Sequence, residues 1–239
     1  MVVAGLWSNI PFRSGICMGF KASVGRILRP ANKSAFVHSL RPDAAIFDIG
    51  CGNGSAARLK QAAPEIRYVG IDIGDYHQTE MAFASMDRYI VTTSEQFAST
   101  IRDIGESFDG VISSHNIEHC EDPDAVIDAM CSVLKPGGVL YLAFPTEASV
   151  DFPKREGTLN FYDDPTHRVV PSFAALAARL EANGMRLEKA IPRSRPLMYA
   201  IAGLLLEPWS AIRNRVDHYG AIWALWGFES IVWARKPRA

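Results

Sequence analysis

The chain has 239 residues, of which 48% are apolar, and its 25 basic and 26 acidic side chains leave it almost neutral. This composition excludes a disordered or collagen-like chain and allows one large hydrophobic core. The charges are uneven, since residues 1–42 carry six basic and no acidic side chains, residues 43–183 carry 10 and 22, and residues 184–239 carry nine and four. The basic ends are either ordinary solvated surface or face an anionic substrate or a membrane.

The four cysteines form no CxxC pair and have no regular spacing. This excludes a zinc ribbon or a disulfide framework and favours a reducing, cytoplasmic location. Residues 1–42 are interpreted as a basic arm or helical extension, with a targeting segment as the alternative. The longest apolar run, residues 197–206, is about half as long as a membrane span requires, so we expect no transmembrane segment.

Apolar runs alternate with helical segments from residue 45 onward. The predicted strands are residues 45–49, 68–73, 89–93, 108–113, 139–144, 185–190 and 228–234. The predicted helices are residues 55–62, 124–134 and 172–183, and the second is expected to stop at Lys135-Pro136-Gly137-Gly138. Most of these strands are apolar on both faces, which predicts an α/β domain over residues 43–239 with a doubly wound, mostly parallel seven-stranded sheet. An apolar helical insertion is expected at about 192–227.

A glycine-rich turn, Asp48-Ile49-Gly50-Cys51-Gly52-Asn53-Gly54, joins the first predicted strand to the first helix. Alternate glycines allow a sharp turn and close approach of a ligand, and the helix that follows offers free N–H groups. Asp72 ends the next strand, where a carboxylate can accept both hydroxyls of a ribose. The turn lacks the sixth-position glycine of the dinucleotide fingerprint, and no Gly-Lys-Ser/Thr follows for a triphosphate.

Four motifs, FDIGCGNG, GIDI, FDGVISSHNIEH and LKPGGVLYLAFP, occur in this order within residues 43–190. Together they resemble the class I S-adenosylmethionine-dependent methyltransferases, which implies a Rossmann-like fold and S-adenosyl-L-methionine as the cofactor. In that family the glycine loop holds the methionine part, the acid after the second strand holds the ribose, and the segment after the fourth strand flanks the donor methyl group. The resemblance therefore implies that the cofactor-binding residues are Asp48, Gly50, Cys51, Gly52, Gly54, Asp72, Ile73, Ser114, His115 and Asn116.

The sequence departs from this family after the third strand, where many members have an acid for the adenine amino group. This chain has Thr92, Thr93, Ser94 and Glu95 there, so Ser94 or main-chain groups are expected to take that place.

The segment His115–His119 also matches H-x-x-E-H, a zinc-peptidase pattern that requires both histidines on one helix. Because the segment directly follows a buried strand, a zinc site is not expected. The methyltransferase interpretation puts Glu118 and His119 in a loop that borders the pocket, and His119 is included as a catalytic candidate, although such a histidine more often shapes the pocket.

A second polar cluster, residues 163–168, follows the fifth strand at the sheet edge where ligands bind. One interpretation makes His167 a general base, with Asp164 orienting it and Arg168 binding an anionic part of the acceptor. A turn at a helix entry is an equal alternative. Asp163, Asp164 and His167 as metal ligands are a lesser one, and no metal is predicted.

Three segments outside the general family motifs bear on the acceptor. The segments around residues 144–168, 196–213 and 223–236 resemble methyltransferases of bacterial surface-polysaccharide biosynthesis, which implies O-methylation of a sugar or polysaccharide precursor. Alternatives are a small-molecule methyltransferase of another acceptor class or a noncatalytic S-adenosylmethionine-binding protein. The acidic centre disfavours nucleic acid, and the basic ends favour an anionic acceptor.

Three roles remain open for the apolar insertion. It is a lid over the acceptor, a homodimer surface, or an element that contacts a membrane peripherally through its apolar face and arginines. Packing of its leucines against the sheet is the favoured interpretation.

Overall fold

The computed structural model describes residues 31–74, 78–216 and 219–238. Most of the predicted basic arm therefore lies outside the described residues, and its last part holds the short helix α2 (Lys33–Val37).

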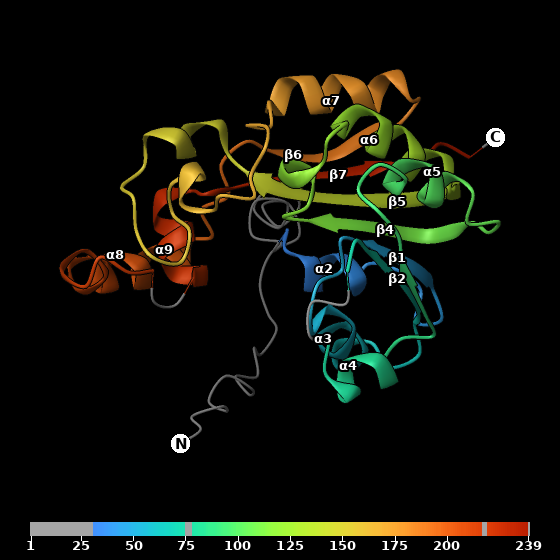
Figure 1. Ribbon diagram of the computed structural model, residues 1–239, viewed down its shortest axis with the longest axis horizontal. Helices are drawn as coiled ribbons and strands as arrows, with labels where there is room; N and C mark the ends of the chain where they lie inside the picture. The colour runs from blue at the N-terminus through green and yellow to red at the C-terminus, as the bar shows by residue number, and fades with distance from the viewer. Residues whose placement is uncertain (1–30, 75–77, 217–218, 239) are drawn as a thin grey trace, which may run out of the picture. The chain divides into compact units, whose positions relative to one another are not determined.

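The described chain is built around one seven-stranded sheet with the order β3-β2-β1-β4-β5-β7-β6 (Figure 1). Strand β7 runs antiparallel to both of its neighbours, β5 and β6, and the other pairs are parallel, which confirms the mostly parallel sheet expected from the sequence. The strands are β1 (Ala45–Ile49), β2 (Arg67–Asp72), β3 (Arg88–Val91), β4 (Phe108–Ser114), β5 (Leu134–Pro145), β6 (Arg186–Ile191) and β7 (Glu229–Arg235).

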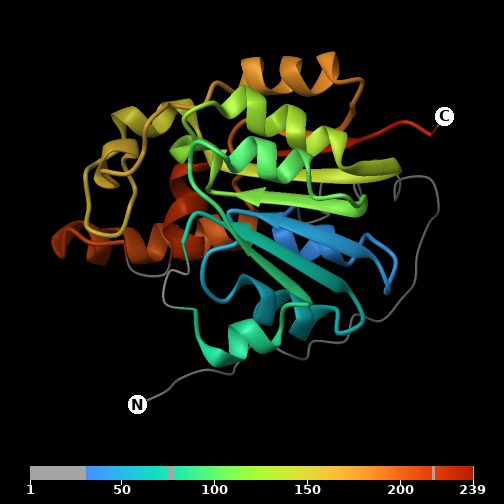
Figure 2. The ribbon, with the colours of Figure 1, turned by 45° about the vertical axis from the view of Figure 1, so that its right-hand side comes forward.

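Helices cover both faces of this sheet (Figure 2). One face carries α5 (Phe97–Arg102), α6 (Pro123–Ser132) and α7 (Phe173–Ala182), and the other carries α2, α3 (Ser55–Ala62) and α4 (Glu80–Ala84). Each face has its own core: Phe47, Ile101 and Met130 belong to the first, and Phe36 and Tyr68 to the second. Burial of these side chains on both faces explains why the central strands are almost continuously apolar.

The prediction for the end of the second helix was wrong. Helix α6 ends at Ser132, and the Lys135-Pro136-Gly137-Gly138 segment that was expected to stop it lies within β5, which begins at Leu134. The register between β4 and β5 shifts there, between Phe108 and Gly110, so the Pro-Gly-Gly segment starts the strand irregularly. Helices α4 and α5 were not predicted, because their five and six residues are too short for a clear helical period.

The insertion before β7 is helical, as expected, and consists of α8 (Leu197–Ile212) and α9 (Tyr219–Trp226). Its leucines do not pack against the sheet. Leu204 and Leu205 are 64% and 77% exposed, because α8 lies against α9 at one end of the domain (Figure 1). Among the described residues, no helix is both long and apolar enough to span a bilayer.

Candidate functional site

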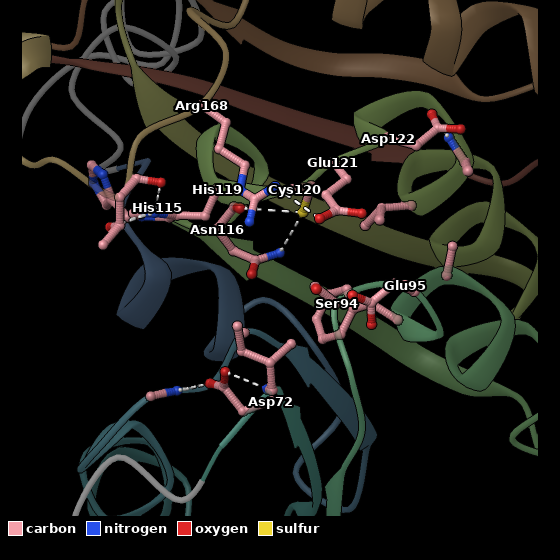
Figure 3. A pocket seen from close by; sticks show the side chains of 18 of the residues that line it. Asp72, Ser94, Glu95, His115, Asn116, His119, Cys120, Glu121, Asp122 and Arg168 are labelled. Carbon is pink, nitrogen blue, oxygen red and sulfur yellow. Dashed lines mark hydrogen bonds and ion pairs between the residues drawn. The ribbon is translucent and has the colours of Figure 1, made fainter.

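A cavity of about 690 Å³ lies at the carboxyl ends of the parallel strands (Figure 3). Its wall comes from the loops after β1, β2, β3 and β4 and from the segment around Thr166, which lies far away in the sequence. Ligands of doubly wound sheets bind at this edge. The predicted residues that line the cavity are Gly50, Gly52, Asp72, Ile73, Ser94, His115, Asn116 and His119.

The glycine turn folds tightly because its backbone is anchored and left-handed. The N–H of Gly50 donates to the carbonyl oxygen of Ile71 at 2.9 Å, and Gly50 has a φ of +68°. A Cβ atom at Gly50 would also overlap the side chain of Asn116. The loops after β1 and β4 therefore meet at a position where only glycine fits.

Asp72 lies across the cavity from Asn116 and His119 (Figure 3). Its Oδ2 accepts the N–H of Gly52 and its Oδ1 accepts the N–H of Ile73, both at 2.8 Å. Burial raises the pKa of Asp72, while the two backbone N–H groups act in the opposite direction. A fixed carboxylate with lone pairs toward the cavity suits a pair of ribose hydroxyls.

Asp48 is not on the cavity wall. It is fully buried below the glycine turn, where its Oδ2 lies 2.8 Å from Lys33 Nζ, 2.6 Å from Ser55 Oγ and 2.7 Å from the Tyr68 hydroxyl. Asp48 therefore ties α2, α3 and β2 together beneath the loop, and its part in binding is indirect. This supporting role could not be predicted from the sequence, because Lys33, which pairs with Asp48, lies before the first recognisable motif.

Replacing Asp48 by alanine should lower the free energy of unfolding by about 3 to 5 kcal/mol. Lys33 then loses its counter-ion, and the hydroxyls of Ser55 and Tyr68 lose the buried oxygen to which they donate. Urea unfolding followed by circular dichroism measures the change. The more conservative Asp48→Asn keeps the shape and should lose less. A fully stable Asp48→Ala protein with reduced cofactor affinity would instead place this carboxylate in the binding site.

Three further predicted residues lie behind the cavity wall: Cys51 packs against Gly70, Gly54 starts α3 with a φ of +76°, and Ser114 ends β4. Burial raises the pKa of the Cys120 thiol to about 12 and raises that of Cys51 further. Both thiols are therefore packing groups, as expected from the sequence, and have little thiolate character.

The far side of the cavity is formed by Ser94, Glu95, Phe97 and the start of α6. Asp122 also lies there and was not predicted; its side chain accepts the N–H of Ala125 at 2.9 Å and caps α6. The signal was present as an acid before a proline at a helix start. Phe97 and Val126 offer apolar surface on which a planar base can pack, and Ser94 beside them offers a polar group to the edge of that base.

His115 is held between two carboxylates. Its Nε2 lies 2.8 Å from Glu229 Oε1, and its Nδ1 lies 3.4 Å from Oε1 of the fully buried Glu118. Burial alone would lower the pKa of His115, but the carboxylates of Glu118 and Glu229 beside the ring outweigh it and raise the pKa to about 10. The ring is therefore an imidazolium at neutral pH, and the carboxylates of Glu118 and Glu229 are its counter-ions at the cavity wall.

The stability of this ion cluster should depend on pH. A raised pKa means that His115 stabilises the folded state fully below its ordinary value of 6.5 and that this contribution is lost as the pH rises toward about 10. We expect the difference in unfolding free energy between the native chain and His115→Asn to shrink across this range by a few kcal/mol. Urea titrations at pH 6 and pH 10 measure it, and a difference that grows with pH would contradict a charged His115.

His119 is oriented by Thr166, which lies 47 residues away in the sequence. The Thr166 hydroxyl donates to Asp164 Oδ1 at 2.6 Å, so its oxygen accepts from His119 Nδ1 at 3.0 Å. The carbonyl oxygen of Thr166 lies 3.2 Å from the same nitrogen. With the proton held on Nδ1, Nε2 of His119 is left as a proton acceptor at the cavity wall.

His167 stands behind His119, with ring centroids 4.8 Å apart, and does not line the cavity. Its Nδ1 donates to the carbonyl oxygen of Phe161 at 2.6 Å. Asp164 Oδ2 is 3.9 Å from His167 Nε2, so Asp164 does not orient this ring by a hydrogen bond and belongs to the turn that holds Thr166. Arg168 does line the cavity, but it is paired with Glu121 at 2.8 Å.

The residues suggested for a metal are rearranged. Asp163 caps the preceding turn by accepting three backbone N–H groups. Instead Glu118, His119 and His167 each bring a ligand atom within 4.8 Å of the others, and the Glu118 oxygens form no hydrogen bond among the described residues. These three side chains can together bind a divalent cation or share a proton. His115 and His119 are not on one α-helix, because the segment Ile117–His119 is a single 3₁₀ turn.

Comparison with known proteins agrees with this geometry. A family model described as a methyltransferase domain matches residues 26–190. The ubiquinone biosynthesis O-methyltransferase of Xanthomonas axonopodis pv. citri (strain 306) is 31% identical over 188 residues, which cover 72% of this chain and 69% of that protein. The human mitochondrial ubiquinone biosynthesis O-methyltransferase is 24% identical over 199 residues, or 78% and 50% of the two chains.

Solved structures support the fold. A SAM-dependent methyltransferase from Archaeoglobus fulgidus aligns with a TM-score of 0.53 at 19% identity, over 91% of this chain and 98% of that one. The cyclopropane synthase MmaA2 from Mycobacterium tuberculosis aligns with a TM-score of 0.51 at 18% identity, over 85% and 82%. The chain therefore belongs to the methyltransferase-domain family and is a class I S-adenosylmethionine-dependent methyltransferase.

Proposed function

We propose that this enzyme transfers the methyl group to a hydroxyl oxygen of a small-molecule acceptor and that His119 is the general base. The observation that carries the proposal is the chain from Asp164 through Thr166 to His119, which leaves Nε2 of a histidine on the cavity wall able to take a proton. The names of the relatives, O-methyltransferases, support the same atom type.

The residues present fit the cofactor. The left-handed glycines bring the backbone of residues 50–52 to the cavity, Asp72 offers a fixed acceptor, and Ser94 and Phe97 border the remaining space. When it is bound, S-adenosylmethionine supplies a methyl group for direct displacement by a nucleophile. The cofactor-binding residues predicted from the sequence fall into two groups. Most of them line the cavity, whereas Asp48, Cys51, Gly54 and Ser114 lie behind its wall and support it.

In this mechanism the protein aligns the acceptor and receives its proton. His119 takes the hydroxyl proton on Nε2 while Thr166 and Asp164 hold the opposite side of the ring, a contribution of about 100- to 10,000-fold to the rate. Alignment of the reacting atoms supplies a further large share of catalysis. His167 supports the ring of His119 from behind and is a positioning residue, and Asp164 is another.

The acceptor class stays a proposal. A sugar or polysaccharide precursor was predicted from the sequence, whereas the relatives quoted above are named for ubiquinone biosynthesis. The pairing of Arg168 with Glu121 weakens the argument for an anionic acceptor, because the cation at the cavity already has a carboxylate partner. We therefore favour an acceptor with a hydroxyl group and no requirement for a formal negative charge.

Release of S-adenosylhomocysteine in the presence of matched acceptors tests the proposal. Catechols, simple phenols and nucleotide sugars represent hydroxyl acceptors, and the corresponding amines are the controls. We expect product with at least one hydroxyl acceptor and none with its amine counterpart. Preferential transfer to amines would contradict the O-methyltransferase assignment, and cofactor binding without transfer to any acceptor would support a noncatalytic binding protein.

A further inference from the structure

The outward face of α8 is almost entirely apolar. Leu197, Leu205 and Ile212 are 68%, 77% and 78% exposed, and together with its remaining members they follow the three- and four-residue spacing of one helix face. The other large apolar side chains exposed on this face are Met198, Ile201, Leu204 and Trp209. A patch of this size is unusual on a soluble monomer and marks an interaction surface.

The opposite face of α8 is fixed to the domain. Gly203 allows α8 to approach α9 so closely that a Cβ atom there would overlap the carbonyl oxygen of Ala221. The buried guanidinium of Arg155 donates to both oxygens of Glu207, at 2.9 and 2.6 Å, and to Ser210 Oγ at 2.9 Å. These contacts use the only acid in residues 192–216, so the apolar face is presented by a rigid helix and carries no negative charge.

The ends of α8 are basic. Arg193 and Arg195 precede the helix, and Arg213 and Arg215 follow it, all four exposed. The face between them includes Trp209, which is 57% exposed, and the Arg213 guanidinium lies 5.7 Å from its ring centroid. Apolar residues with an amphipathic aromatic ring between arginines are typical of helices that lie in a membrane interface.

We propose that α8 docks on the surface of an anionic lipid bilayer, with its apolar face in the headgroup region and its four arginines on lipid phosphates. The charge pattern favours this occupant over a second copy of the chain, because two such helices facing each other would bring like-charged arginines close together at both ends. The 16-residue helix lies in the interface and does not cross the bilayer.

Helix α8 lies beyond the carboxyl ends of the parallel strands (Figure 1), and the residues that line the cavity come from the loops at these same ends. Helix α9 connects α8 to the cavity, because Trp223 packs against the His115 ring with centroids 5.0 Å apart while the other side of α9 contacts Gly203 of α8. Docking through α8 therefore holds the cavity close to the lipid surface, where an acceptor that partitions into the bilayer is concentrated. The docking itself does not depend on the proposed O-methylation.

Co-sedimentation of the full chain with vesicles tests this proposal. We expect binding to vesicles of phosphatidylcholine with phosphatidylglycerol that weakens as salt is raised, and little binding to phosphatidylcholine alone. The double variant Leu204→Ser, Leu205→Ser should bind the anionic vesicles at least about tenfold more weakly, because two exposed leucines no longer enter the interface. Met81→Ser, which removes a 73% exposed apolar side chain from α4, is the matched control and should bind like the native chain.

Cofactor affinity of each variant shows that its domain is folded and separates this test from that of the enzymatic function. Failure of the native chain to sediment with anionic vesicles would overturn the proposal. A double variant that binds them as well as Met81→Ser would also overturn it. So would a native dimer in size-exclusion chromatography that the double variant converts to a monomer, because a second copy would then cover this face.

Discussion

Replacing Asp72 by alanine should weaken the binding of S-adenosylmethionine by about 1 to 3 kcal/mol, which is roughly a 5- to 150-fold increase in Kd. The physical reason is that the ribose hydroxyls lose their acceptor, and the N–H of Gly52 loses the bond that shapes the loop beside it. Isothermal titration calorimetry measures the effect directly and needs no knowledge of the acceptor.

Asp87 provides the matched control for Asp72. It also accepts a backbone N–H from β2, that of Tyr68 at 2.7 Å, but it does not line the cavity. Asp87→Ala should therefore lower stability and leave the cofactor Kd within a few fold of the native value. Equal Kd values for the native chain and Asp72→Ala would refute the ribose assignment.

Replacing His119 by glutamine should lower kcat by about 100- to 10,000-fold while the cofactor Kd changes little, because the ring is lost as a proton acceptor and the wall keeps its shape. His167→Gln should have a smaller effect, since its ring stands behind that of His119. Steady-state kinetics with any accepted substrate, together with calorimetry, separate the two effects. A larger loss in His167→Gln would assign the base to His167, which is one of the two interpretations that the sequence allowed for that residue.

The same kinetics distinguish a base from a metal ligand. Glu118, His119 and His167 lie close enough to share a cation, so a chelator must be included as a control. We expect activity to be unchanged by the chelator if His119 acts as a base. Loss of activity that is restored by a divalent cation would contradict that role and assign these three side chains to a metal site.

The sheet and the cofactor loop could be predicted from the sequence because their signals are local. Continuous apolar runs identify strands buried on both faces, and the glycines of residues 50–54 identify a turn that other residues cannot adopt. An acid at the end of the second strand is placed at the cavity by strand direction alone, and Asp72 lies on the cavity wall.

The chemistry beyond the cofactor could not be predicted in the same way, because it depends on contacts between distant segments. His115 meets Glu229 across 114 residues, and His119 meets Thr166 across 47. The spacing within residues 163–168 suggested that Asp164 orients His167, whereas the fold directs Asp164 to Thr166 and Phe161 to His167. A sequence shows which groups are available, but the tautomer of each histidine follows from its partner.

The same reasoning applies to α8. Its sequence is apolar enough to be read as a core helix, and only the packing of Gly203 on α9 and the pairing of Glu207 with Arg155 show which face remains outside. The basic residues in the C-terminal part of the chain include the four arginines that flank α8, so they bear on the surface of that helix and give little information about the reaction.

The most direct test of the proposed reaction is the fate of a ¹³C-labelled methyl group. The native enzyme is incubated with labelled S-adenosylmethionine and an accepted substrate, and the product is examined by NMR. We expect the label on an oxygen of the product, with formation of that product lost in His119→Gln and weakened in Asp72→Ala. A label on nitrogen, carbon or sulfur would contradict the assignment of this enzyme as an O-methyltransferase.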